Sequence, residues 1–100
     1  MNTTQDPIEK IVIVGGGTSG WITAATIGNT FKNTNLQIEL VESEDIGVIG
    51  VGEATIPSLI SILNSLGIDL VDFIKETQAS FKLGIQFEDW HTIGEKYFHP

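Results

Sequence analysis

The chain has 100 residues, 41% of them hydrophobic and 18% charged, which is the composition of a globular protein. Its formal charge is −8, and its five lysines are scattered without any arginine, so binding to nucleic acid or to an anionic membrane surface is disfavoured. The lack of cysteine excludes disulfides and thiolate chemistry in this chain, and no apolar run or leader pattern suggests a membrane span or export, so we expect a cytoplasmic location.

A compact apolar run at residues 11–14 ends at a glycine-rich turn and is followed by a segment with helical spacing. The run predicts a strand buried on both faces, as in a parallel sheet covered by helices. Gly15-x-Gly17-x-x-Gly20 fits the dinucleotide-binding fingerprint. The first glycine permits the turn, the second lets a pyrophosphate approach, and the third lets the helix lie close to the strand. We therefore predict phosphate groups at the start of this helix.

An acidic residue follows the second strand-like run, residues 36–41. Glu42 lies 22 positions beyond Gly20, where a carboxylate can accept hydrogen bonds from ribose hydroxyls and repel the 2′-phosphate of NADP. The alternative is a glycine-rich turn with an unrelated surface glutamate. Strand, turn, helix and acid together favour a nucleotide site.

These elements predict an α/β protein with a Rossmann-like fold. One hundred residues are too few for a complete dinucleotide-binding fold with helices on both faces of its sheet. We therefore expect residues 1–9 to be a flexible lead and residues 10–100 to be the N-terminal part of a longer domain.

A second glycine-rich stretch, residues 47–52, stands where an ordinary dinucleotide fold would begin another helix. Its apolar residues suggest a buried loop on the cofactor side, with backbone close to the ligand: Ile46, Val48, Ile49, Val51 and Ile56. The alternative is a flexible surface loop.

Two short helices are predicted next. The first begins near Pro57 and ends at Gly67, with an apolar stripe of Leu59, Ile60, Ile62, Leu63 and Leu66. Asp69 is expected to cap the second helix, which runs to about Gln78 with Leu70, Phe73 and Ile74 facing inward.

Residues 80–88 alternate between apolar and polar side chains and predict a strand with one packed face. Lys82 would project from its polar face, beside a glycine that leaves space over the sheet. The alternative is a solvated lysine. Gly94 is expected in a turn before another strand at Tyr97-Phe98. His91 and His99 have no ligand pattern around them, so we expect surface or turn residues and no metal site.

Four stretches together resemble the N-terminal part of the flavin-dependent tryptophan halogenases: Gly15-Gly16-Gly17-Thr18-Ser19-Gly20-Trp21, Val41-Glu42-Ser43, Gly50-Val51-Gly52-Glu53-Ala54-Thr55-Ile56-Pro57 and Ser80-Phe81-Lys82-Leu83-Gly84-Ile85. The first stretch is shared with flavoproteins generally, whereas the third is much more specific. The resemblance covers roughly residues 8–100.

The resemblance implies a flavin monooxygenase-like fold that binds FAD, receives it reduced from a separate flavin reductase, and uses O2 and chloride or bromide as co-substrates. In that family, hypohalous acid reaches an indole-type substrate through a tunnel and meets a lysine, whose position is matched here by Lys82. A cationic lysine can polarise the hypohalous acid, and a neutral amine can attack the halogen; both remain open.

The resemblance also implies the cofactor-binding residues. These are Gly15, Gly16, Gly17, Thr18, Ser19, Gly20, Glu42, Ser43, Ile46, Ile49, Glu53 and Ala54. Glu53 could instead cap the helix at Pro57. An FAD monooxygenase, an NAD-dependent oxidoreductase and a non-catalytic flavin-binding module are the alternative functions. The sequence does not identify the substrate, the ring position that is halogenated or the preferred halide. It also leaves the oligomeric state open, with a homodimer as one possibility. The 100 residues by themselves are expected to be inactive, because the rest of the family's catalytic apparatus belongs to later segments.

Overall fold

The computed structural model describes residues 5–47 and 54–100. It divides into two units, Met1–Ile68 and Asp69–Pro100. Within the described ranges, no helix combines the length and the apolar character needed to cross a bilayer.

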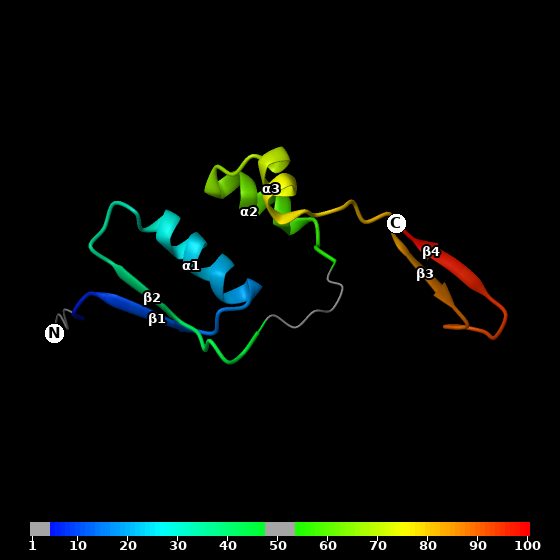
Figure 1. The fold of residues 1–100 in the computed structure, drawn as a ribbon, viewed down its shortest axis with the longest axis horizontal. Coiled ribbons are helices and arrows are strands. Elements are labelled where there is room, and N and C mark those ends of the chain that lie inside the picture. The colour runs from blue at the N-terminus through cyan, green and yellow to red at the C-terminus, as the bar shows by residue number, and fades with distance from the viewer. Residues whose placement is uncertain (1–4, 48–53) are drawn as a thin grey trace. The chain divides into compact units, whose positions relative to one another are not determined.

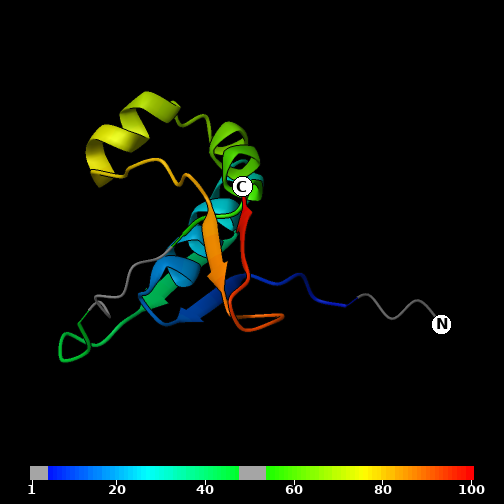
Figure 2. The same ribbon diagram turned by 90° about the vertical axis from the view of Figure 1, so that its right-hand side faces the viewer.

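The first unit contains a parallel strand pair with a crossover helix. Strand β1 (Lys10–Val14) pairs along its whole length with β2 (Gln37–Val41), in a register that sets Lys10 beside Gln37 and Val14 beside Val41. Helix α1 (Thr18–Thr30) connects the strands and lies along the pair, as Figures 1 and 2 show. This confirms the predicted strand, turn, helix and second strand.

The two faces of the strand pair differ in exposure. On the face toward α1, four aliphatic side chains are half-buried: Ile11, Ile13, Ile38 and Leu40. On the other face Val12, Val14 and Val41 are exposed, Val14 to 84%. The prediction that the first strand is buried on both faces is therefore wrong for this chain. The run of valine and isoleucine shows that both faces of β1 are apolar, but α1 covers only the face that carries Ile11 and Ile13.

Helix α2 (Ser58–Leu66) completes the first unit and packs against α1. It ends at Gly67, whose φ of +69° lies in the left-handed region, as predicted for a glycine stop. Leu63, in the predicted stripe, is only 4% exposed, but Ile60 remains exposed, contrary to the prediction. The side-chain amide of Asn29 on α1 donates a 2.9 Å hydrogen bond to the carbonyl of Ser65, near the end of α2.

The second unit begins with helix α3 (Leu70–Thr77). The carboxylate of Asp69 accepts hydrogen bonds from the backbone N–H groups of Val71 and Asp72, at 2.9 and 3.1 Å, which confirms the predicted cap. The helix ends at Gln78 in the left-handed conformation. Leu70 is exposed rather than inward.

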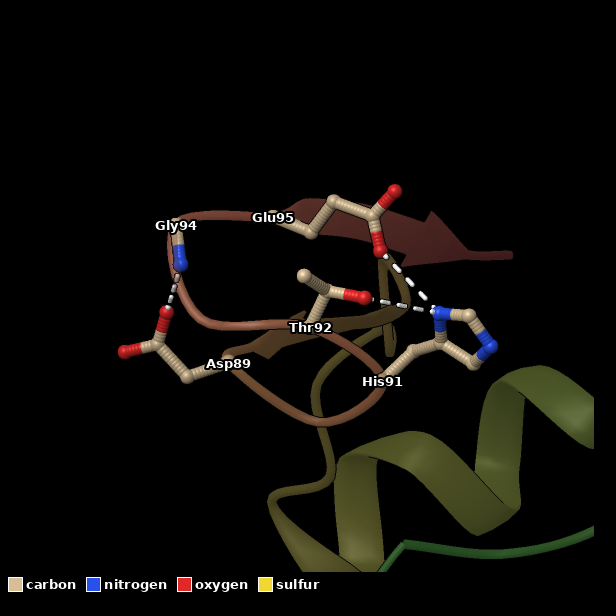
Figure 3. A network of polar contacts seen from close by, with 5 residues as sticks. All are labelled: Asp89, His91, Thr92, Gly94 and Glu95. Carbon is tan, nitrogen blue, oxygen red and sulfur yellow. Dashed lines mark hydrogen bonds and ion pairs between the residues drawn. The ribbon is translucent and has the colours of Figure 1, made fainter.

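An antiparallel hairpin follows, made of β3 (Ile85–Glu88) and β4 (Lys96–His99). Phe87 stacks on Tyr97, with ring centroids 4.9 Å apart. In the connecting turn, the N–H of Gly94 donates to the Asp89 carboxylate at 2.6 Å, and the ring of His91 lies 3.4 Å from Glu95 (Figure 3). Gly94 is in the predicted turn, and His91 is one of its exposed members.

The strand predicted over residues 80–88 is shorter than expected, and Lys82 precedes it rather than lying on it. Pairing with β4 begins at Ile85, which lies opposite His99. Gly84 also has a φ of +148°, outside the range of a regular strand. Phe81 and Leu83, expected on the packed face, are both exposed.

The space over Gly84 is also different from the prediction. A Cβ at this position would collide with the ring of Phe98. The glycine therefore makes room for an aromatic side chain of the hairpin itself, and it does not leave the area beside Lys82 open.

Candidate functional site

The turn between β1 and α1 has the geometry expected of a dinucleotide-binding turn. Gly15 adopts a φ of +123°, a conformation that side chains other than glycine rarely take. Its N–H donates a 2.9 Å hydrogen bond to the carbonyl of Val41, which ties the turn to the end of β2. Gly17 is the N-cap residue of α1, and its carbonyl accepts the N–H of Trp21 at 3.1 Å.

Two other glycines are required by close contacts. A Cβ at Gly20 would collide with the carbonyl oxygen of Gly15, so only glycine lets the helix lie this close to the turn. A Cβ at Gly16 would collide with the carboxylate of Glu42. Glycine at position 16 therefore allows the acidic side chain to lie directly against the turn.

Gly17 faces open space instead, because a Cβ there would have no neighbouring atom within 4 Å. The helix that begins at this residue has no side-chain cap and no acidic residue in its first turn. Its first N–H groups have no partners within the helix, and its dipole makes this end positive. The start of α1 thus offers hydrogen-bond donors and a favourable field to an anionic group.

A cavity of about 1000 Å³ lies over this helix start. Its walls come from the ends of both strands, from the turn and from the loop after β2: Val14, Gly15, Gly16, Gly17, Thr18, Trp21, Val41, Glu42, Ser43, Ile46 and Gly47. Backbone donors, a carboxylate and several apolar side chains therefore share one space. A second hollow, of about 570 Å³, is lined by Pro7–Glu9, Ile11, Phe31 and Thr34–Leu36.

The cavity brings together seven of the residues predicted from the sequence: Gly15, Gly16, Gly17, Thr18, Glu42, Ser43 and Ile46. Ser19 and Gly20 belong to the first turn of α1 but not to the cavity wall. Ala54 is exposed and also lies outside that wall. Ile49 and Glu53 lie outside the described residues.

The loop after Glu42 was expected to be buried, and its described residues are not. Ile46 is 77% exposed although it lines the cavity, and Ile56 is exposed as well. Their burial requires atoms that residues 5–47 and 54–100 do not supply.

Lys82 belongs to the second unit, in a segment without regular secondary structure between α3 and β3. Its side chain is exposed and makes no ion pair with any described residue. The predicted rigid strand support for this amine is therefore missing within the described residues. Those residues also contain no group of three or more side chains suited to hold a metal ion.

Four members of the cavity were not among the predicted site residues: Val14, Trp21, Val41 and Gly47. The two valines belong to the two predicted strands, and Gly47 to the second glycine-rich stretch. Trp21 stands three positions after Thr18, so helical spacing sets both on the same face of α1. That spacing is the signal that could have identified it.

The cavity combines an uncapped helix start, a carboxylate and apolar walls, and comparison with known proteins shows the family in which this arrangement belongs. Residues 10–100 match the family model described as tryptophan halogenase. The chain belongs to the tryptophan halogenase family. The predicted resemblance is confirmed.

Individual halogenases show the extent of the similarity. Tryptophan 7-halogenase RebH of Lentzea aerocolonigenes is 45% identical over 89 residues, which are 88% of this chain and 17% of RebH. Xcc4156, a flavin-dependent halogenase from Xanthomonas campestris, gives a TM-score of 0.82 at 49% identity over 92% of this chain and 18% of its own. The tryptophan 6-halogenase SttH from Streptomyces toxytricini gives 0.77 at 38% identity over 92% and 19%.

The chain thus spans less than a fifth of the length of these relatives. Its α/β elements are those at the start of the Rossmann-like FAD domain in the flavin-dependent halogenase structures, which confirms the predicted fold class.

Proposed function

We propose that the full-length protein carrying these residues is an FADH2-dependent halogenase that chlorinates or brominates tryptophan or another indole. In this proposal, residues 10–100 are the N-terminal part of its FAD-binding domain and residues 1–9 are a lead. A separate flavin reductase supplies the reduced cofactor, and O2 and halide are the co-substrates. The observation that carries the proposal is the uncapped start of α1 beneath the cavity, together with the family membership of the chain.

The residues of the turn fit the diphosphate of FAD. Backbone N–H groups at the start of α1 would hold its oxygens, and the open space at Gly17 lets the phosphates approach the backbone. The chain has no arginine to compete for this role. Glu42, held against Gly16, would accept hydrogen bonds from the ribose hydroxyls. The other proposed contacts with FAD are Ser19, Ser43, Ala54, Ile49 and Glu53. Glu53 could bind FAD or instead cap the helix that begins near Pro57.

When bound and reduced, FAD supplies the oxidising chemistry with O2 that converts halide into an electrophilic halogen. Lys82 is proposed to act on that electrophile. Its ammonium group can donate a hydrogen bond to the oxygen of hypohalous acid and so increase the positive character of the halogen. Its neutral amine can instead attack the halogen of hypohalous acid as a nucleophile, so that a nitrogen–halogen bond forms, the oxygen–halogen bond breaks, and the hydroxide released takes up the amine proton to leave as water.

The test uses the full-length protein with reduced FAD, O2, chloride or bromide, and tryptophan or indole, with products identified by mass spectrometry. We expect halide-dependent formation of a product in which halogen replaces hydrogen. Lys82→Ala should lower the rate by at least about 100-fold, by comparison with removal of other oriented donors in active sites. Lys75→Ala is the matched control, because Lys75 is an exposed lysine on α3 in the same unit.

Lys82→Arg separates the two roles, because arginine keeps the positive charge and the donors but does not become a neutral nucleophile. Activity in this variant supports hydrogen bonding. Product formation that survives Lys82→Ala would remove the lysine from the mechanism, and oxygenated products without halide would support a monooxygenase instead. Binding of FAD without either product would support a non-catalytic flavin-binding module.

A further inference from the structure

Trp21 is a large apolar side chain that faces the nucleotide cavity instead of the interior of the first unit. Its backbone N–H is fixed by a 3.1 Å hydrogen bond to the carbonyl of Gly17, one helical turn earlier. Its side chain is 54% exposed and forms part of the cavity wall. The backbone at Trp21 is therefore tied to the proposed diphosphate site, while its indole remains available for contact.

A second apolar wall of the same cavity comes from the loop after β2. Ile46 is also largely exposed and follows the proposed ribose acceptor, Glu42, by four residues. A ligand that fills this cavity thus meets backbone donors, a carboxylate and two large apolar side chains. Its complementary chemistry is an anionic phosphate, a hydroxylated sugar and a flat ring that gains free energy by leaving water.

We propose that Trp21 is a positioning residue for the adenine ring of an adenine dinucleotide, with its indole packed against the base and Ile46 as the other apolar wall. This inference rests on the proposed FAD binding. Adenine is chosen over the flavin ring because it is joined to the ribose that Glu42 would bind, and Glu42 and Ile46 belong to the same short segment of the wall.

The test is the Kd of the full-length protein for FAD and, separately, for ADP, measured by isothermal titration calorimetry. Removal of an aromatic side chain that stacks on a base should raise both Kd values by about tenfold in Trp21→Ala. Trp21→Phe should recover most of the affinity, whereas Trp21→Leu, which keeps apolar bulk without a ring, should recover less. Trp90→Ala is the matched control, because Trp90 is an exposed tryptophan in the hairpin turn of the other unit.

The outcomes separate this inference from the proposed function. If wild-type protein binds FAD and Trp21→Ala binds both ligands equally well, the role of Trp21 is refuted and the FAD site stands. Weakened binding of FAD but not of ADP would also refute the adenine contact. If wild-type protein binds neither ligand, the proposed function itself fails. Circular dichroism of each variant checks that a change in affinity is not caused by unfolding.

Discussion

Replacing Gly20 by alanine tests whether α1 must lie this close to the turn. The added Cβ would collide with the carbonyl oxygen of Gly15 and lie 3.1 Å from its carbonyl carbon. Both are backbone atoms, and Gly15 is held to Val41 by a 2.9 Å hydrogen bond, so no flexible side chain can move away. Relief requires a shift of the helix or of the turn.

Three contributions set the expected change in the free energy of unfolding of Gly20→Ala. Overpacking costs about 1–3 kcal/mol, weakening of the Gly15–Val41 hydrogen bond adds about 1 kcal/mol, and the higher helix propensity of alanine returns up to about 1 kcal/mol. We expect a net loss of about 1–3 kcal/mol in the free energy of unfolding. The Kd for FAD should rise as well, because the same shift moves the proposed phosphate donors.

Gly28→Ala is the matched control on the same helix. A Cβ there would lie 3.7 Å from Cδ1 of Ile38, an ordinary van der Waals distance. It should keep the helix-propensity gain of up to about 1 kcal/mol and leave FAD affinity unchanged. The assays are urea unfolding of the full-length protein followed by circular dichroism, and calorimetric titration with FAD. A Gly20→Ala protein as stable as the Gly28→Ala protein and with wild-type affinity would refute this account of the turn.

Three further substitutions test the helix ends, each by the same unfolding measurement. Asp69→Ala should lower the free energy of unfolding by about 1 kcal/mol, because the carboxylate accepts hydrogen bonds from two N–H groups of α3, at 2.9 and 3.1 Å. Asp69→Asn is the control, because asparagine can also cap a helix. If Asp69→Ala were as stable as this control, the cap would be contradicted. Asn29→Ala should lower the free energy of unfolding by about 1 kcal/mol, because it removes the 2.9 Å hydrogen bond to the carbonyl of Ser65. An unchanged stability would show that α2 does not pack against α1 at this position. Gly67→Ala should lower the free energy of unfolding by about 1–2 kcal/mol, because alanine is strained at a φ of +69°. An unchanged stability would show that the C-cap of α2 adopts another conformation.

Local features of both units could be predicted because they depend on residues close together in sequence. The glycine spacing from Gly15 to Gly20 encodes a turn whose requirements are backbone conformation and lack of bulk, and both are visible in the sequence itself. The stop at Gly67 and the cap at Asp69 follow from the properties of single residues at helix ends. Parallel pairing of β1 with β2 follows from the helix between them.

Features that depend on distant partners could not be predicted in this way. Alternation over residues 80–88 shows which side chains share a face, but it does not show where a pairing strand ends; here pairing begins only at Ile85. The same limit explains why Gly84, expected to leave space near Lys82, accommodates the ring of Phe98. The exposure of Ile46 could not be predicted, because an apolar side chain indicates that burial is favourable but does not identify the residues that would cover it. The proposed roles of Lys82, Ser19 and Ala54 remain predictions for the experiments above.

The exposed valines of the β1–β2 pair have a practical consequence for work on this segment. Among residues 5–47 and 54–100, Val12, Val14 and Val41 form an exposed aliphatic surface on a parallel ribbon of two strands. Residues 1–100 expressed in isolation should therefore tend to self-associate, and turbidity or light scattering would reveal it. Inhibitor screens or crystallisation trials on such a fragment would sample contacts between copies instead of the cavity proposed to bind FAD.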